Sequence, residues 1–114
     1  MREMTKVFKA LTDSNRIRIL KMLEVKPLCV CEITEILRLA TSTVSKHLSI
    51  LREADLIADS REGKWVIYRL NQSSQNEPAN KLLPLIKQWL PEDAIIKQDL
   101  EKVKIVDRNT ICGT

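Results

Sequence analysis

The sequence predicts a mainly α-helical fold of the α+β class, in which helices precede and follow one β-hairpin. Apolar residues recur at helical spacing through residues 4–54 and again through residues 82–106. Between these stretches lie two short β-type runs, 56–59 and 65–70. A chain of 114 residues is in the size range of a single domain, so we expect these elements to share one modest core.

Four helices are expected before the hairpin. The first has an apolar stripe made of Met4, Val7, Phe8 and Leu11. The second has its own stripe, made of Ile17, Leu20 and Leu23, and turns three cations away from it: Arg16, Arg18 and Lys21. It ends before Pro27, and a third helix follows over about 30–37. The fourth runs from about Thr41 to Ala54.

The fourth helix has an unusual polar face. Its apolar stripe consists of Val44, Leu48 and Leu51. The opposite face carries hydroxyls and a cation with almost no carboxylate, namely Ser42, Ser45, Lys46 and Ser49. An ordinary solvated helix mixes Glu with Lys, so this face suits an anionic partner.

The two β-type runs predict a hairpin that turns within residues 60–64. Gly63 is one of only two glycines in the chain and stands where a tight turn needs a positive φ angle. The same segment carries Arg61 and Lys64, so the tip of the hairpin is basic.

The elements after the hairpin are less regular. Residues 71–80 are polar and predict a loop, and Pro84 implies a late start or a kink in the helix that follows. The next helix, 92–106, opens with proline and acidic residues that suit a helix N-terminus. Residues 107–114 have no period and predict a flexible tail.

The positive charge lies in the first part of the chain. The formal net charge is +4. Residues 1–70 contain 13 Lys and Arg against 9 Asp and Glu, whereas residues 71–114 contain 6 of each kind. The excess therefore accompanies the polar helix and the hairpin.

Three helices, a polar fourth helix and a basic hairpin, in this order, predict a winged helix-turn-helix whose fourth helix enters the major groove of DNA. The segments 40–48 (ATSTVSKHL) and 51–54 (LREA) resemble the recognition helix of the ArsR/SmtB family of metal-responsive repressors, and 63–70 is similar to the family's wing. The resemblance covers about residues 1–90. It implies that DNA is contacted by Thr41, Ser42, Thr43, Ser45, Lys46 and Ser49 on the helix, and by Arg61 and Lys64 on the wing.

Two positions qualify this resemblance. At Ala40, family members often place a capping Ser, so either Thr41 caps the helix one residue later or the cap is missing. His47 is the only histidine and flanks the apolar stripe, so we expect it to support the helix or contact a phosphate rather than bind metal. The His-containing zinc site that some relatives carry on their C-terminal helix cannot be built in the same way.

The three cysteines predict metal binding or thiol reactivity. No apolar run could span a bilayer, and the N-terminus lacks a secretory signal, so we expect a soluble cytoplasmic protein with no membrane partner. A reducing compartment keeps thiols free, and three thiols cannot all pair within one molecule.

Residues 28–33 (LCVCEI) resemble the motif of the family's arsenic and antimony sensors, and of its cadmium and lead sensors. In a regular helix Cys29 and Cys31 would point to nearly opposite sides, so an ion held by both must distort the helix start after Pro27. We expect this distortion to reach the DNA-reading helix. The helix N-terminus is also expected to lower the pKa of both thiols and so favour thiolates.

The third ligand of this metal site is open. Arsenic sensors of the best-known pattern have another cysteine where this chain has Thr34. Trivalent arsenic favours three sulfur donors, and the remaining thiol is Cys112 in the tail. Either Cys112 closes the site, from its own protomer or from the partner, or two thiolates and a non-protein donor hold the ion.

Together these features predict a homodimer whose apo form binds double-stranded operator DNA and leaves it when As(III) or Sb(III) binds as inducer, without an organic cofactor. Residues 1–91 are expected to bind DNA and dimerise, with the C-terminal helix 92–106 and the tail 107–114 following. The alternatives are a Cd- or Pb-responsive repressor, or a thiol redox sensor in which Cys29 or Cys31 pairs with Cys112 on oxidation. An enzyme such as a dithiol reductase is not expected, because there is no βαβ pattern, phosphate-binding glycine loop or acid/base pair.

Overall fold

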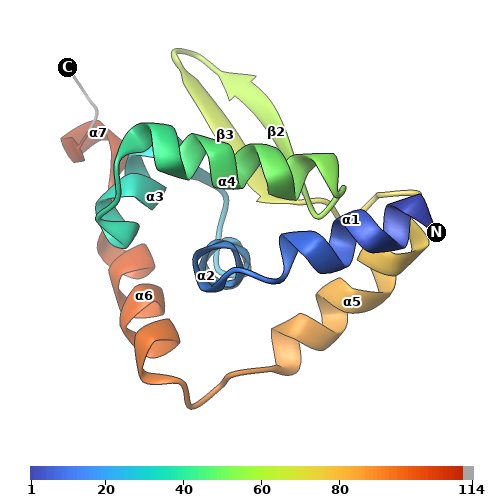
Figure 1. Ribbon diagram of the computed structural model, residues 1–114. Coiled ribbons are helices and arrows are strands. Elements are labelled where there is room, and N and C mark those ends of the chain that lie inside the picture. Colours follow the sequence, from blue (N-terminus) through green and yellow to red (C-terminus); the bar gives the residue numbers. More distant parts are fainter. Residues whose placement is uncertain (112–114) are drawn as a thin grey trace.

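The helices and the hairpin follow in the predicted order in the computed structural model, which describes residues 1–111 (Figure 1). The elements up to the hairpin are α1 (Arg2–Ala10), α2 (Ser14–Leu23), β1 (Leu28–Cys29), α3 (Val30–Leu37) and α4 (Thr41–Glu53). The hairpin and the C-terminal elements are β2 (Ile57–Glu62), β3 (Trp65–Leu70), α5 (Glu77–Gln88), α6 (Ala94–Ile105) and α7 (Arg108–Ile111). The α+β class and the winged helix-turn-helix are confirmed.

Short polar side chains fix where three of the helices begin. Asp13 Oδ1 accepts the backbone N–H groups of Asn15 and Arg16 at 2.8 and 3.3 Å, which starts α2. Asn76 and Asp93 accept in the same way at the starts of α5 and α6. Ala40 precedes α4 without any side-chain cap, so of the two alternatives left open by the sequence, the missing cap is the one found.

A third strand joins the predicted hairpin. β2 and β3 pair antiparallel, with Ile57 opposite Leu70 and Glu62 opposite Trp65. β1 pairs with the other side of β3, where Cys29 lies opposite Ile67, so the strand order is β1-β3-β2. The sequence did not indicate β1 because two residues cannot show an alternating period.

The structure corrects two segment boundaries. The expected turn 60–64 is shorter, because Ser60–Glu62 continue β2 and only Gly63 and Lys64 connect the strands. Gly63 has a φ of 62°, as predicted, and a Cβ there would meet nothing within 4 Å, so it is the backbone angle that favours glycine. The expected loop 71–80 ends at Asn76, and α5 continues through Pro84.

The core confirms the apolar stripe of α4 and contradicts the prediction for the cations of α2. Val44, Leu48 and Leu51 are fully buried. Lys21, predicted to turn away from the core, is only 3% exposed. Its ammonium group donates to the carbonyls of Ile86 at 3.0 Å and Trp89 at 2.9 Å, at the C-terminal end of α5. The Ile86 carbonyl also accepts the N–H of Trp89, and Lys21 gives the carbonyls at this helix end a further donor that fixes α5 on α2.

A buried ion pair holds α6 against α2. Arg18 Nε and Nη2 donate to the two carboxylate oxygens of Asp99 at 2.8 and 2.9 Å, and the Asp99 side chain is 2% exposed. This paired geometry is the strongest that arginine and a carboxylate form. The carboxylate holds the pKa of Arg18 above its ordinary value, chiefly through these hydrogen bonds.

The C-terminal segment is partly helical. Residues 108–111, in the segment where a flexible tail was expected, form α7, which packs against α3. Asp107 Oδ1 accepts the N–H of Asn109 at 2.9 Å in its first turn. Within residues 1–111, no helix is both long and apolar enough to cross a bilayer.

Candidate functional site

The polar face of α4 is exposed along its whole length. All six of the residues that the sequence assigned to DNA contact on this helix are exposed: Thr41, Ser42, Thr43, Ser45, Lys46 and Ser49. The opposite side of the helix packs into the core, so the exposed polar side chains lie on the side turned away from it. Because Ala40 gives no cap, the first N–H groups of α4 also remain available to an anion.

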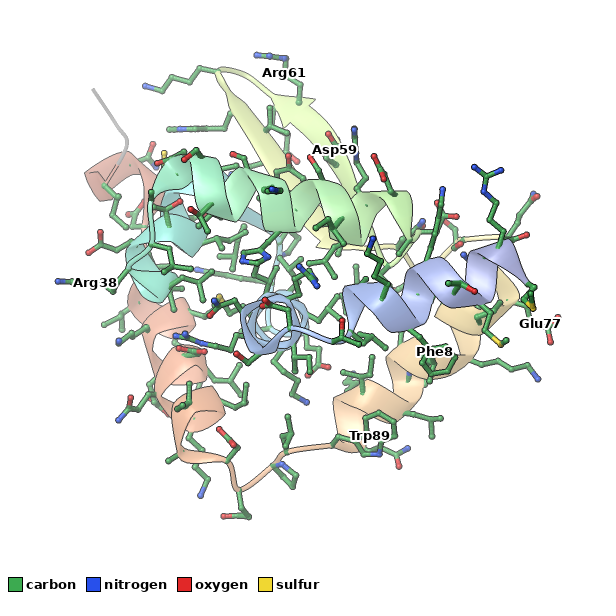
Figure 2. All side chains as sticks on the ribbon, viewed as in Figure 1. Phe8, Arg38, Asp59, Arg61, Glu77 and Trp89 are labelled. Carbon is green, nitrogen blue, oxygen red and sulfur yellow. The ribbon has the colours of Figure 1, made fainter. Side chains whose placement is uncertain are left out.

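The wing carries the other two predicted contact residues. Arg61 projects from the end of the hairpin in Figure 2, and both Arg61 and Lys64 are exposed. The Lys64 ammonium lies 4.9 Å from the centre of the Trp65 ring, a cation–π distance. Among the described residues, the side chains of Arg61 and Lys46 form no hydrogen bond or ion pair, so both cations are available to an anionic partner.

Two polar links, neither indicated by the sequence, fix α4 relative to its neighbours. Arg52 at the end of α4 pairs with Asp59 of β2 at 3.5 Å and so connects the helix to the wing. Asn76 donates to the carbonyl of Ala54 at 3.3 Å while its other amide atom caps α5. Asn76 is buried, so this second link is shielded from water, whereas the exposed Arg52 pair contributes little energy. An Asn just before Glu77-Pro78 was a readable helix-start signal.

His47 supports α4 from beneath. Its Nδ1 lies 3.2 Å from the guanidinium of Arg16, and because arginine can only donate, this nitrogen accepts. Arg16 also donates to the carbonyls of Ala10 at 2.8 Å and Lys9 at 3.3 Å, at the end of α1. Arg16, expected to face solvent, therefore joins α1, α2 and α4.

Cys29 lies where β1 meets α3 and is 2% exposed. Its backbone N–H donates to Glu32 Oε1 at 2.9 Å, while its sulfur accepts from the backbone of Glu32, a capping box with cysteine in the usual place of serine. Burial raises the pKa of the Cys29 thiol, and the backbone hydrogen bonds offset only part of this rise. The predicted lowering of this pKa is therefore wrong for Cys29, because desolvation outweighs the helix N-terminus.

The other positions considered for the metal site, Cys31, Cys112 and Thr34, differ in their surroundings. Cys31 is half-buried and disulfide-bonded, and Cys112 lies outside the described residues. Thr34 Oγ1 is buried without a hydrogen-bond partner in the described part of the chain. Within residues 1–111 no group of three His, Cys, Asp or Glu side chains could hold a metal ion. Residues 1–111 thus supply two cysteine sulfurs, of which only Cys29 is a free thiol, and a three-sulfur site needs a further donor.

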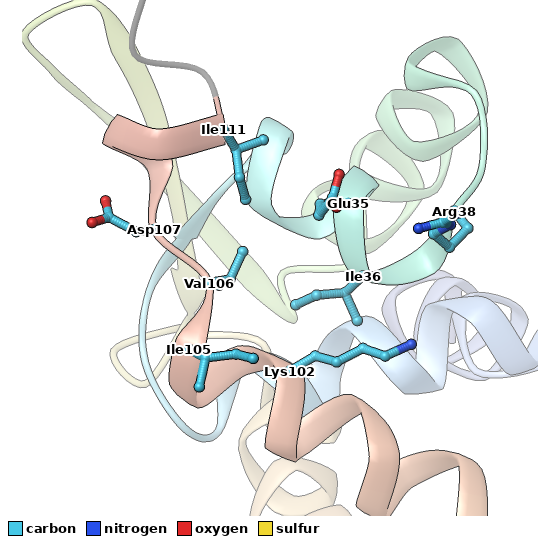
Figure 3. A pocket seen from close by; sticks show the side chains of 8 residues that line it. All are labelled: Glu35, Ile36, Arg38, Lys102, Ile105, Val106, Asp107 and Ile111. Carbon is cyan, nitrogen blue, oxygen red and sulfur yellow. The ribbon is translucent and has the colours of Figure 1, made fainter.

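A cavity of about 350 Å³ lies between α3 and the junction of α6 with α7 (Figure 3). Its lining is apolar at Ile36, Ile105, Val106 and Ile111, with the charged groups of Glu35, Arg38, Lys102 and Asp107 around them. No cysteine among the described residues lines it, so the cavity is distinct from the thiol site.

An apolar surface on α1 and α5 is left uncovered. α1 packs against α5, and both carry large exposed apolar side chains: Met4 and Phe8 on α1, Leu85 on α5, and Trp89 at its end. Figure 2 shows Phe8 and Trp89 on the same side of the molecule. About half of each of these two rings is exposed, at 51% and 49%.

Comparison with known proteins identifies the family. The model of the bacterial regulatory protein arsR family matches residues 13–59, which include α2, β1, α3 and α4. The chain is 35% identical over 106 residues to the arsenical resistance operon repressor of Escherichia coli, covering 90% of this chain and 80% of that protein. It is 39% identical over 92 residues to the arsenic resistance transcriptional regulator ArsR1 of Pseudomonas putida, 80% of this chain, but spans only 61% of that protein's length.

A solved structure agrees with this result. Reduced HlyU from Vibrio cholerae superposes with a TM-score of 0.66 at 26% identity, covering 80% of this chain and 92% of that one. The chain therefore belongs to the ArsR family of bacterial regulatory proteins, the ArsR/SmtB family, whose members are DNA-binding transcriptional regulators and not enzymes.

Proposed function

We propose that this protein is a transcriptional repressor that binds operator DNA as an apo homodimer through α4 and the wing. The observation that carries the proposal is the continuous exposed surface of hydroxyls on α4, with Lys46 beside them and Arg61 and Lys64 on the adjacent hairpin. The hydroxyls can reach base edges and the cations can reach phosphates. Binding of a labelled inverted-repeat operator, compared with a scrambled duplex at the same salt concentration, tests the proposal.

The exposed apolar surface on α1 and α5 supports a homodimer. A twofold dimer presents two α4 helices to half-sites about one DNA turn apart. We expect the native protein to sediment as a dimer at micromolar concentration, and the double variant Phe8→Glu/Trp89→Glu to sediment as a monomer, because its dimer would bury two carboxylates from each protomer in the interface. Ile95→Glu, at an exposed position on α6, is the matched control. A native monomer, or a double variant that remains dimeric, would exclude this interface.

We further propose that As(III) or Sb(III) is the inducer and that Cys29 and Cys31, when reduced, are its ligands. The relatives in Escherichia coli and Pseudomonas putida are named for arsenic resistance, and both thiols lie at the start of α3. An ion on Cys29 would take the sulfur from its capping interaction with Glu32, at the point where β1 pairs with the wing strand. The third ligand, which Thr34 cannot supply as sulfur, would be Cys112 or a non-protein donor.

Cysteine variants separate sensing from DNA binding. We expect Cys29→Ser and Cys31→Ser to retain operator affinity and to lose release by arsenite, because a hydroxyl is a poor ligand for a soft ion.

Cys112→Ser distinguishes a site with three protein thiolates, in which the variant loses the response, from a site with two, in which the variant keeps it. Thr34→Cys should tighten arsenite binding by supplying a third sulfur one helical turn from Cys31. Fluorescence anisotropy of the operator against arsenite concentration measures all four, and retained release in both the Cys29 and Cys31 variants would exclude the metalloid site.

Thiol oxidation is the second candidate signal. Two observations favour it: Cys31 is disulfide-bonded, and HlyU is known in a structure described as reduced. We expect arsenite, but not peroxide or persulfide, to release DNA if the protein senses metalloid, and the reverse if it senses oxidants. Titrations with cadmium and lead in the same assay test the remaining ions.

A further inference from the structure

Arg108 of α7 joins the cysteine site to the wing. Its Nε lies 3.4 Å from Glu32 Oε1, and its guanidinium carbon lies 5.7 Å from the centre of the Trp65 ring. Both distances are within the range of attractive contacts, an ion pair in the first case and a cation–π contact in the second. Glu32, Arg108 and Trp65 come from α3, α7 and β3, so three elements distant in sequence meet at one guanidinium.

At the cysteine end of this cluster, the carboxylate of Glu32 is buried and paired. Glu32 is 2% exposed, and one of its oxygens receives both the Cys29 N–H and the Arg108 guanidinium. A buried carboxylate needs such partners, because leaving its charge unpaired costs several kcal/mol. Any change at Cys29 that displaces Glu32 must therefore displace Arg108 or leave a buried charge without its cation.

The wing end lies beside a predicted DNA contact. Trp65 is the first residue of β3 and pairs with Glu62, immediately after the turn of the hairpin. The same ring contacts the Lys64 ammonium at 4.9 Å. Moving Trp65 would therefore move a cation that the proposed DNA interface uses.

The segment that carries Arg108 borders a cavity. The cavity of about 350 Å³ in Figure 3 lies between α3 and the α6–α7 junction, with Val106 and Ile111 on its α7 side. α7 is only four residues long and packs against α3 around this unfilled space. The ion pair of Arg108 with Glu32 and its contact with Trp65 add to the packing that holds α7 on α3.

We propose that Arg108 is a positioning residue that transmits the state of the Cys29 site to the wing through Glu32 and Trp65. The inference rests on the proposed function for its inducer, but the link itself is a property of the unliganded protein. Displacement of Glu32 on the cysteine side releases the guanidinium, and Trp65 and Lys64 then lose the position that suits DNA.

The link is tested first without any inducer. Protein labelled with 5-fluorotryptophan gives two ¹⁹F NMR signals, and Trp89, which directly follows α5 and lies outside the cluster, serves as the internal control. We expect Glu32→Gln to shift the Trp65 signal in the native background and not in an Arg108→Ala background, with the Trp89 signal unmoved in both. Equal shifts in the two backgrounds, or no shift in either, would overturn the proposal.

The second test measures how strongly arsenite weakens operator binding. It needs no Glu32 variant, so it does not depend on whether such a variant folds. In the native protein arsenite should weaken operator binding by a factor of about 5 to 150, the usual range for coupled sites. Arg108→Ala should still bind arsenite but reduce this factor to below about 3, Arg108→Lys should restore it in part, and the exposed neighbour Asn109→Ala should leave it unchanged. A native factor retained in Arg108→Ala overturns the link. If arsenite has no effect on the native protein, the inducer is wrong and the NMR cycle alone decides the link.

Discussion

Replacing all three cations of the proposed DNA-reading surface, Lys46→Ala, Arg61→Ala and Lys64→Ala, is expected to lower the operator affinity of the dimer on the order of 10,000-fold, at about 1 kcal/mol for each of the charge-assisted contacts that the two protomers lose. All three side chains are exposed, and Lys46 lies on α4 while the other two lie on the wing. Each lost phosphate contact should also reduce the slope of log affinity against log salt by about one unit, so the triple variant, which lacks three cations in each protomer of the dimer, loses about six. Operator titrations at several salt concentrations measure both quantities.

The matched control removes the same charge elsewhere. Lys81→Ala, Lys97→Ala and Lys104→Ala take three exposed cations from α5 and α6, and each of these cations pairs only with an exposed carboxylate. We expect this control to retain most of the affinity and the salt slope, since surface ion pairs contribute little to stability. Equal losses in the two triple variants would show that net charge, and not the assigned surface, governs binding.

The second large effect concerns the buried pair between α2 and α6. Arg18→Ala is expected to destabilise the fold by about 3 to 5 kcal/mol, because Asp99 then remains buried without its cation. Chemical denaturation of the native protein and the variant, with a shared slope, measures this difference in unfolding free energy.

A double variant separates the lost pair from lost packing. Arg18→Ala/Asp99→Asn removes the uncompensated charge and should recover part of the stability, since the penalty comes from the charge and not from the missing contact alone. The exposed Arg2→Ala should change stability by less than about 0.5 kcal/mol. A loss below about 1 kcal/mol in Arg18→Ala would mean that Asp99 becomes hydrated and that α6 is not held by this pair.

Several features of the protein were determined by its sequence alone. The helical period of α4 places its apolar residues on one side and its hydroxyl-bearing residues on the other. It therefore predicted that the first set is buried and the second exposed. Gly63 located the hairpin turn, since few other residues adopt its backbone angle. Both are local properties, in which neighbouring residues alone decide the conformation. Proximity of Cys29 and Cys31 to a helix start was readable for the same reason.

The tertiary structure decided what the charged residues do. The period of α2 predicted that Arg16, Arg18 and Lys21 face solvent, yet each meets a partner 6 to 81 residues away in sequence. The pKa of Cys29 is raised and not lowered, because burial depends on how β1 and α3 pack, which no local pattern records. Arg108 likewise gave no signal, since a lone cation in a polar tail gains a role only when α7 places it between Glu32 and Trp65. Helical and strand periods come from the chain's local geometry, whereas the partner of a long charged side chain is set by which elements the core brings together.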